Sequence, residues 1–246
     1  MKFERRCKCE IDAWERQQER ERQEQERTKI EKAFSMADLG PEFAEATFER
    51  WQPKPKTERV YEVARDYARN FADKMRTGEG LIIYSERNGN GKSYLAAAII
   101  NHIVPQGYTA IFRAVKPLFR RIQRSWDGGS VKESDIIDAL CRADLLVLDD
   151  AGAERWTEWR EETLYDIIDE RWRWRRPIIL TTNLKMKRDP EDSADKLVLP
   201  EQVGPRCWSR LLGRCPIVRN AGEMDVRLEN ARKQRAGQQN ETGGAP

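Results

Sequence analysis

The segment LIIYSERNGNGKS, residues 81–93, carries the clearest structural signal in this chain. Four apolar residues lead into a loop with glycines at 89 and 91, and the apolar run YLAAAII follows at 94–100. A strand, a glycine-containing loop and a helix in this order predict a phosphate-binding loop (P-loop). The glycines let the backbone wrap phosphate oxygens, and the N-terminus of the helix adds positive charge. Lys92 is expected to reach the β- and γ-phosphates, and Ser93 to bind Mg²⁺.

One position departs from the pattern G-x-x-x-x-G-K-[ST], because Glu86 stands where the first glycine is expected. A carboxylate there must point away from a triphosphate or weaken its binding. The alternative interpretation is a glycine-rich turn with a purely structural role. The residues expected to contact the nucleotide around this loop are Asn88, Gly89, Asn90, Gly91, Lys92, Ser93 and Tyr94.

Two further apolar strands end in polar residues. Leu145–Asp149 is followed by Asp150, and Ile178–Thr182 is followed by Asn183. Ligands of open α/β sheets bind at the carboxyl ends of the strands. We therefore expect Asp149 to hold Mg²⁺ and Asp150 to orient the attacking water. Asn183 is expected at the γ-phosphate or the water, and the alternative is an asparagine that only caps its strand.

Short β-branched runs alternate with helical stretches along the chain, which predicts an α/β fold with a parallel sheet covered by helices on both faces. An amphipathic helix is expected to carry Val60 to Met75 and to end at Gly78. The expected strands are 81–84, 108–113, 145–149, 178–182 and 217–219, and the expected later helices are 92–104, 115–126, 132–142, 158–174 and 201–212.

Composition excludes several classes of protein. The chain has 246 residues, a formal net charge of +3 and 35% charged residues, so a strongly basic coat is excluded. The longest apolar run, 94–100, is far shorter than the roughly 20 residues of a membrane span. We expect no secretory signal, because no apolar segment follows the start. With five cysteines and no such signal, a reducing cytoplasm is the expected location.

We expect four regions. Residues 1–35 hold a charged helical arm that lacks apolar residues from 15 to 29. Cys7 and Cys9 ahead of it have the spacing of half a zinc site, but no second pair of ligands is near in the sequence, so we do not expect zinc bound within one chain. The arm is either a solvated spacer or a docking arm for a partner. Residues 36–56 are expected to connect the arm to the core and pack on it. The domain that carries the P-loop is expected at 57–228, and a disordered tail at 229–246.

Several longer sequence motifs of this chain resemble those of the DnaC/DnaI-type bacterial and phage helicase loaders, which are AAA+ ATPases. The resemblance covers roughly residues 40–228. It implies an AAA+ core with the P-loop strand in the middle of the sheet, with ATP and Mg²⁺ as cofactors. It also implies self-association on single-stranded DNA and a replicative helicase of the DnaB type as partner. The motifs that carry the resemblance are FAEATF (43–48), LLVLDDAGAE (145–154), TEW (157–159), LYDIIDER (164–171), PIILTTNL (177–184) and RCWSRLL (206–212).

The resemblance also suggests roles for three arginines. Arg210 matches the arginine finger that reaches a neighbouring subunit's γ-phosphate, with Arg206, one helical turn earlier, as the second candidate. Arg227 resembles the sensor arginine that contacts the nucleotide of its own subunit. An arginine suits these places because its planar fork matches phosphate oxygens. For all three, a surface salt bridge is the alternative.

The segment FRAVKPLFRRIQRSW, residues 112–126, has five cations and no acid. Cations beside Phe119 and Trp126 are typical of a groove for a single nucleic-acid strand. A solvated helix face is the alternative. A second basic segment, RWRWRR at 171–176, is expected to belong mainly to the core and its rim. The expected DNA-binding residues are Arg113, Lys116, Phe119, Arg120, Arg121 and Arg124.

The leading hypothesis is thus an ATP-dependent helicase loader whose ATP hydrolysis is slow and modulated by DNA or a partner. An IstB-type transposition ATPase is a related alternative, and the Cys-x-Cys start favours the loader over it. A third hypothesis is a non-hydrolysing adaptor that uses ATP as structural glue. Glu86 is its best support, whereas the intact P-loop lysine and strand-end carboxylates favour an enzyme.

Overall fold

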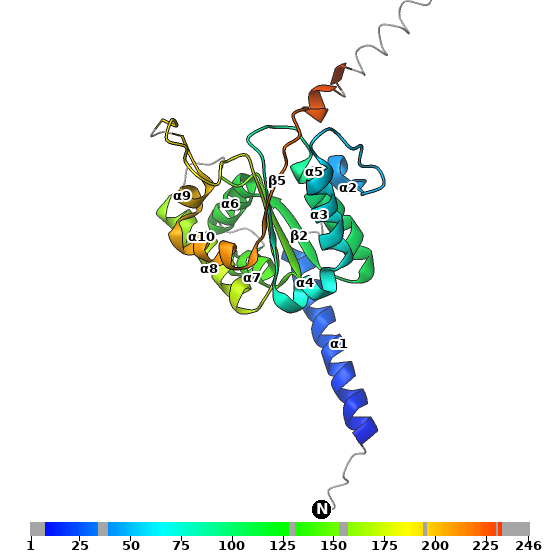
Figure 1. The fold of residues 1–246 in the computed structure, drawn as a ribbon. Coiled ribbons are helices and arrows are strands. Elements are labelled where there is room, and N and C mark those ends of the chain that lie inside the picture. Colours follow the sequence, from blue (N-terminus) through cyan, green and yellow to red (C-terminus); the bar gives the residue numbers. More distant parts are fainter. Residues whose placement is uncertain are drawn as a thin grey trace, which may run out of the picture.

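A computed structural model describes residues 8–33, 39–127, 131–152, 157–193, 196–229 and 231–232. Its centre is a five-stranded, all-parallel sheet with the strand order β2-β3-β4-β1-β5. Figure 1 shows helices on both sides of this sheet, as the sequence predicted. The strands are β1 (Leu81–Tyr84), β2 (Ala110–Ala114), β3 (Leu145–Asp149), β4 (Ile178–Thr182) and β5 (Ile217–Arg219).

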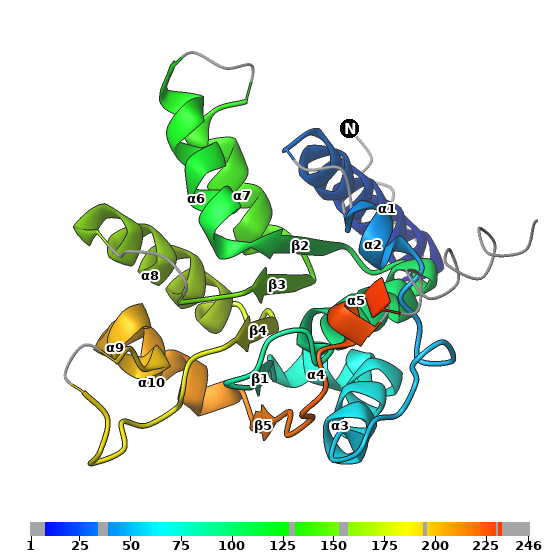
Figure 2. The same ribbon diagram turned by 90° about the horizontal axis from the view of Figure 1, so that it is seen from above.

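Two hydrophobic clusters, one on each face, hold the layers together. Figure 2 shows the helices that lie on either side of the sheet. Successive side chains of a strand point to opposite faces, so Ile82 joins one cluster while Leu81 and Ile83 join the other. Helices α6 (Val115–Arg124), α7 (Glu133–Arg142), α8 (Glu158–Arg173), α9 (Leu199–Val203) and α10 (Pro205–Arg214) cover the first face. The second face is covered by α2 (Gly40–Ala44), α3 (Glu58–Arg69), α4 (Phe71–Thr77) and α5 (Lys92–Ile103). Short 3₁₀ turns follow α5 at Val104–Gln106 and α6 at Ser125–Asp127.

Three details of the predicted fold are wrong. The helix expected from Val60 to Met75 is two helices, α3 and α4, which break at Asn70 before α4 ends at the left-handed Gly78. The helix expected at 201–212 is also two, because Gly204 has a φ of 79° and ends α9. The P-loop strand β1 lies between β4 and β5, so β4 rather than β1 occupies the middle of the sheet.

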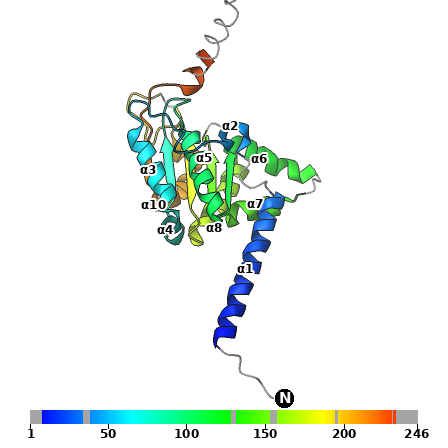
Figure 3. The same cartoon turned by 90° about the vertical axis from the view of Figure 1, so that its right-hand side faces the viewer.

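The charged arm forms one long helix, α1 (Lys8–Ala33), which extends beyond the stretch without apolar residues, 15–29, at both ends. It contacts α7 and extends away from the rest of the molecule (Figure 3). Its exposed face carries local pairs such as Arg22 with Glu19 at 2.9 Å, which support an isolated helix. Cys7 lies outside the described residues. Among the helices that the structure describes, α1 included, not one has the length and apolar character of a membrane span.

The connecting segment packs on the core as predicted. Ala46 and Phe48 are buried in the second hydrophobic cluster. From α5, the Asn101 side chain donates to the carbonyls of Phe43 and Ala46 at 2.9 and 2.8 Å. At the other end of the chain, Glu229, which we assigned to the tail, is helical and pairs with Lys54 at 2.9 Å. The rest of the expected tail lies mostly outside the described residues.

Arg171, the first residue of the RWRWRR segment, is completely buried. Its guanidinium donates to the carbonyls of Leu140 and Ala143, at the end of α7, at 2.7 and 2.8 Å. It also donates to the Pro177 carbonyl at 2.6 Å. Burial lowers its pKa to about 9. Arg171, on α8, therefore connects the end of α7 to the residue before β4. This structural role agrees with the core-and-rim interpretation of the segment.

Candidate nucleotide site

The P-loop connects the end of β1 to the start of α5, and its two glycines adopt left-handed conformations. Gly89 has a φ of 66° and Gly91 a φ of 93°. A Cβ atom on Gly91 would lie 2.4 Å from the Trp51 ring, and one on Gly89 would lie 1.9 Å from a carboxylate oxygen of Asp225. Only glycine fits both the backbone conformation and the space at these positions.

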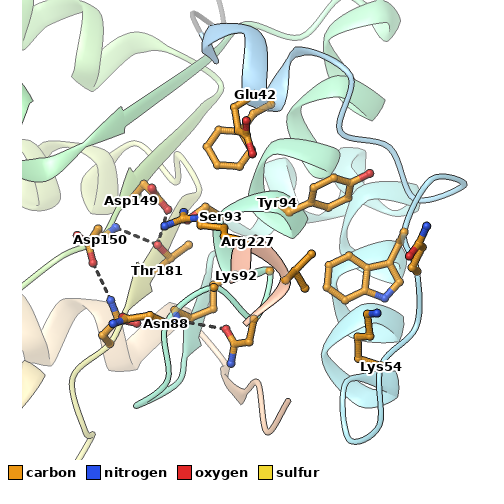
Figure 4. A pocket seen from close by; sticks show the side chains of 18 of the residues that line it. Glu42, Lys54, Asn88, Lys92, Ser93, Tyr94, Asp149, Asp150, Thr181 and Arg227 are labelled. Carbon is orange, nitrogen blue, oxygen red and sulfur yellow. Dashed lines mark hydrogen bonds between the residues drawn. The ribbon is translucent and has the colours of Figure 1, made fainter. Parts of the chain in front are cut away.

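A cavity of about 730 Å³ opens at the carboxyl edge of the sheet beside this loop (Figure 4). Residues 88–94 of the P-loop and the start of α5 line it, together with Asp149, Asp150 and Asn183 from the ends of β3 and β4. Arg227 enters from the C-terminal segment. The structure therefore brings together the expected P-loop residues, the two strand-end carboxylates, the asparagine and the sensor arginine.

Lys92 is 7% exposed, and its ammonium group donates to the Arg87 carbonyl at 2.8 Å and to Asn90 Oδ1 at 3.3 Å. Burial lowers the pKa of Lys92 to about 8, although Asp150 and Asp149 nearby favour the charged form. Arg227 adds a second cation and favours the neutral lysine. Lys92 is buried and Arg227 is exposed, and together these two cations make this end of the cavity suited to a polyanion.

This pKa predicts a pH dependence. A bound phosphate favours the ammonium form of Lys92, so above pH 8 the protein must take up a proton when it binds a triphosphate. The affinity for MgATP should therefore fall by up to about tenfold per pH unit above pH 8. Titration calorimetry in buffers of different ionisation enthalpy would measure the proton uptake. A constant affinity to pH 9.5 would contradict the prediction.

The carboxylates at the end of β3 are positioned by β4. Thr181 Oγ1 donates to Asp149 Oδ1 at 2.6 Å and accepts from the Asp150 backbone N–H at 3.0 Å. Asp150 has a φ of 54°, and its Oδ1 accepts from Asn183 Nδ2 at 2.9 Å. Burial raises the pKa of Asp149, while hydrogen bonds from Thr181 and Ser93 oppose the shift. The two carboxylates and Asn183 therefore form one connected group.

Sequence reasoning missed Thr181 and the N-terminal wall of the cavity. A signal for Thr181 existed, because alternate strand residues share a face and Asn183 follows two positions later. The wall includes Glu42, Phe43, Trp51 and Lys54. Trp51 lies in a ring group with Tyr61 and Tyr94, at centroid distances of 6.2 and 5.5 Å. Only tertiary packing reveals this wall.

The Glu86 side chain turns toward two cations outside the cavity. Its carboxylate oxygens lie 3.9 Å from Lys185 Nζ and 3.7 Å from the Arg219 guanidinium. The departure from the P-loop pattern thus adds a surface ion-pair contact and leaves the cavity lined by the loop backbone and Lys92. This is the outward orientation that the sequence required for nucleotide binding.

The other two arginines lie on α10, away from the lining of the cavity. Arg210 is bonded to Asp169 and donates to the Tyr165 hydroxyl at 2.9 Å. Its guanidinium also lies over the Tyr165 ring, 4.8 Å from the centroid. Arg206 is exposed and lies over the same ring at 5.7 Å. Arg206, expected among the nucleotide contacts, is therefore outside the cavity of its own chain.

The basic segment divides between a strand and a helix. Arg113 belongs to β2, so it does not share a helix face with the cations of α6. Phe119 is 1% exposed and packs edge-on against Trp159, so its predicted role in base stacking is wrong. Trp126 is the exposed aromatic at this place, 54% accessible and also edge-on to Trp159. The exposed cations are Lys116, Arg120, Arg121 and Arg124.

A parallel sheet of this order, with a P-loop after β1, acidic residues after β3 and an asparagine after β4, defines an AAA+ P-loop ATPase domain. The family model of the IstB-like ATP binding proteins matches residues 12–233, and the chain belongs to this family. Among curated proteins, Escherichia coli K12 YdaV is 30% identical over 72% of this chain and 68% of its own length.

Two matches concern a helicase loader. The replicative helicase loader DnaC of Escherichia coli K12 is 22% identical over 73% of this chain and 72% of its own length. A crystal structure of the DnaC helicase loader superposes with a TM-score of 0.62 at 26% identity, covering 74% of this chain and 99% of that one. The chain is thus similar to DnaC-type loaders in both sequence and fold, which confirms the resemblance seen in its motifs.

Proposed function

We propose that this protein is an ATP-dependent loader that helps to place a replicative helicase of the DnaB type on single-stranded DNA. The observation that carries the proposal is the cavity where Lys92, Asp149, Asp150 and Arg227 converge. Similarity to the replicative helicase loader DnaC supports the choice of partner. We infer that the protein acts in the cytoplasm of a bacterium and is encoded by the bacterium or its phage.

The residues of the cavity fit ATP with Mg²⁺. Lys92 and Arg227 supply positive charge for the phosphates, and P-loop amide groups add donors. Ser93 and Asp149 would hold Mg²⁺, which screens phosphate charge and would favour the ionised form of a carboxyl whose pKa burial has raised. Asp150 would orient a water molecule, and its bond to Asn183 fixes the direction of its carboxylate. We therefore propose ATP hydrolysis at this site, slow by enzyme standards.

We propose that α6 contacts the single strand. Its exposed cations lie beside Trp126, whose ring offers a stacking surface. The helix starts directly at the nucleotide site, because Ala114, which precedes it, lines the cavity. This junction gives a physical route by which nucleotide binding could change the position of the DNA-contacting helix.

A double substitution tests the DNA contact. Arg120→Ala with Arg124→Ala should weaken binding to an oligothymidine by about tenfold or more and lower the magnitude of the salt slope by about 1.4. Fluorescence anisotropy at several salt concentrations would measure both. The matched control is Arg59→Ala with Arg69→Ala, two exposed arginines on α3. Equal losses in both double variants would contradict a specific role for α6.

Self-association would bring α10 of one subunit to the cavity of the next, and we propose Arg210 as the residue that completes that site. Its contacts with Asp169 and Tyr165 hold the guanidinium at a defined place on the surface of α10. Arg206, on the same helix and over the same ring, is the second candidate.

Arg210→Ala should leave the affinity for ATP within about threefold of the parent, because the residue lies outside its own cavity. Turnover should fall strongly, since arginine fingers contribute about 10³- to 10⁵-fold. Steady-state phosphate release at saturating ATP would measure it, with Arg206→Ala in parallel. Normal ATP turnover in Arg210→Ala would contradict the assignment of Arg210 as the arginine finger. If turnover is lost only in Arg206→Ala, Arg206 is the arginine finger instead.

The structure bears differently on the two alternative functions. The non-hydrolysing adaptor loses its best support, because Glu86 faces Lys185 and Arg219 instead of the cavity. The IstB-type transposition ATPase keeps the support of the family model.

Steady-state ATP hydrolysis with and without single-stranded DNA, using Lys92→Ala as the blank, tests the proposed ATPase activity. A rate that equals the blank under both conditions would contradict the proposed ATPase.

A further inference from the structure

A pair of buried asparagines joins the P-loop to the C-terminal segment that carries Arg227. Asn90 in the P-loop is 2% exposed, and Asn220, directly after β5, is fully buried. Asn220 Nδ2 donates to the Asn90 carbonyl at 2.8 Å, while Asn90 Nδ2 donates to the Asn220 carbonyl at 3.4 Å. Each side chain thus bonds the backbone of the other residue. We call these two residues the asparagine clip.

Hydrogen bonds extend the clip on both sides. Asn90 Nδ2 also donates to Ser85 Oγ at 2.7 Å, which ties the clip to the start of the P-loop. Asn220 Oδ1 accepts from the Gly222 backbone N–H at 3.0 Å, which shapes the turn after β5. The same Asn90 side chain accepts from the Lys92 ammonium at 3.3 Å. A buried network with so many satisfied groups favours one geometry.

A second set of contacts continues from this turn to Arg227. The Val226 backbone N–H donates to the Gly89 carbonyl at 2.9 Å. Asp225 Oδ1 accepts from the backbone N–H groups of Arg227 and Leu228 at 3.0 and 3.3 Å, and so caps the helical turn that carries the arginine. That turn is therefore attached to the P-loop and cannot shift without breaking bonds to it.

We propose that Asn220 is a positioning residue for the nucleotide site: through Asn90 it locks the P-loop and the Arg227 segment into one unit. The inference rests on the proposed nucleotide binding. Asn220 does not line the cavity and acts only through the residues that do. Arg227 then contributes to nucleotide affinity only while the asparagine clip holds its segment near Lys92, at the end of the cavity where we expect the phosphates.

A double-mutant cycle on nucleotide affinity tests this. Arg227→Ala alone should raise the Kd for MgATP about tenfold, and Asn220→Ala alone should raise it by a similar factor. In the Asn220→Ala background, adding Arg227→Ala should raise the Kd by less than about threefold. A fluorescent ATP analogue gives these constants, and thermal unfolding without nucleotide reports the stability of each variant.

The matched control is Thr109→Ala at the opposite edge of the sheet. Thr109 Oγ1 donates to Asp144 Oδ2 at 2.9 Å and accepts from the Asp144 backbone N–H at 2.9 Å, so it is also a reciprocal clip between segments. Its loss should lower the unfolding temperature and leave the effect of Arg227→Ala at its full tenfold. If Asn220→Ala does not fold, Asn90→Ser breaks the same clip from the P-loop side and should give the same reduced effect.

The outcomes separate the two proposals. If the parent protein shows no MgATP binding, the proposed function fails. If the parent binds and Arg227→Ala costs the full tenfold in the Asn220→Ala or Asn90→Ser background, the effects are additive and the positioning role is overturned. An Arg227 effect reduced in the clip variants and full in Thr109→Ala supports the inference.

Discussion

Lys92→Ala should lower the affinity for MgATP by at least about 100-fold and remove ATP turnover. The ammonium group of Lys92 is the P-loop cation that lines the cavity, and it lies in a buried place where charge-assisted hydrogen bonds are strong. Losing such bonds to a triphosphate costs about 3 kcal/mol or more, which corresponds to this factor. Equilibrium binding of a fluorescent ATP analogue and steady-state phosphate release measure the two effects.

The substitution should not unfold the protein, because the lowered pKa shows that burial of the charged lysine is unfavourable. A matched control is Lys74→Ala on α4. Lys74 is also a partly buried lysine, paired with Glu79 at 2.6 Å, and its loss should leave nucleotide affinity unchanged. Similar affinities in Lys92→Ala and the parent protein would contradict the assignment of the cavity.

The second large effect concerns stability. Arg171→Met should lower the free energy of unfolding by about 3–5 kcal/mol, because it leaves buried carbonyls at the end of α7 and before β4 without donors. The unfolding temperature should fall by on the order of 10 °C. Urea and thermal unfolding monitored by circular dichroism would measure the change.

Arg173→Met is the control, two residues further along the same helix. Its side chain is 65% exposed and pairs with Asp169 at 2.8 Å. Asp169 is buried but keeps Arg210 as a second partner, so losing the exposed Arg173 should cost about 1 kcal/mol or less. If both variants lose the same stability, the buried hydrogen bonds of Arg171 are not the cause. Arg171→Lys should lie between the parent and Arg171→Met, since a single ammonium group cannot bond carbonyls in so many directions.

Local patterns predicted the elements that position the nucleotide site. The P-loop glycines, the strand that ends in Asp149 and the strand that precedes Asn183 each carry their signal within a few residues. A parallel sheet then brings their carboxyl ends to one edge, whatever their distance in the sequence. The expected cavity lining followed from this rule together with the resemblance that marked Arg227.

Features that depend on tertiary packing were missed or wrong. The apolar stripe of α6 includes Phe119, and the sequence alone does not show that this ring faces the sheet while Trp126 remains exposed. The sequence assigned the RWRWRR segment to the core and its rim but did not show that the charged Arg171 is its fully buried member, which donates to carbonyls at the end of α7. The wall around Trp51 comes from a segment that precedes the sheet, so no local pattern connects it to the P-loop.

We propose that nucleotide binding in this cavity drives the loading of a replicative helicase. The most direct test is unwinding of a forked duplex on circular single-stranded DNA by a DnaB-type helicase of the same host, with and without this protein and ATP. We predict faster onset of unwinding with the parent protein, and onset at the helicase-only rate with Lys92→Ala. Unchanged onset with a parent protein that binds both ATP and single-stranded DNA would contradict the loader function.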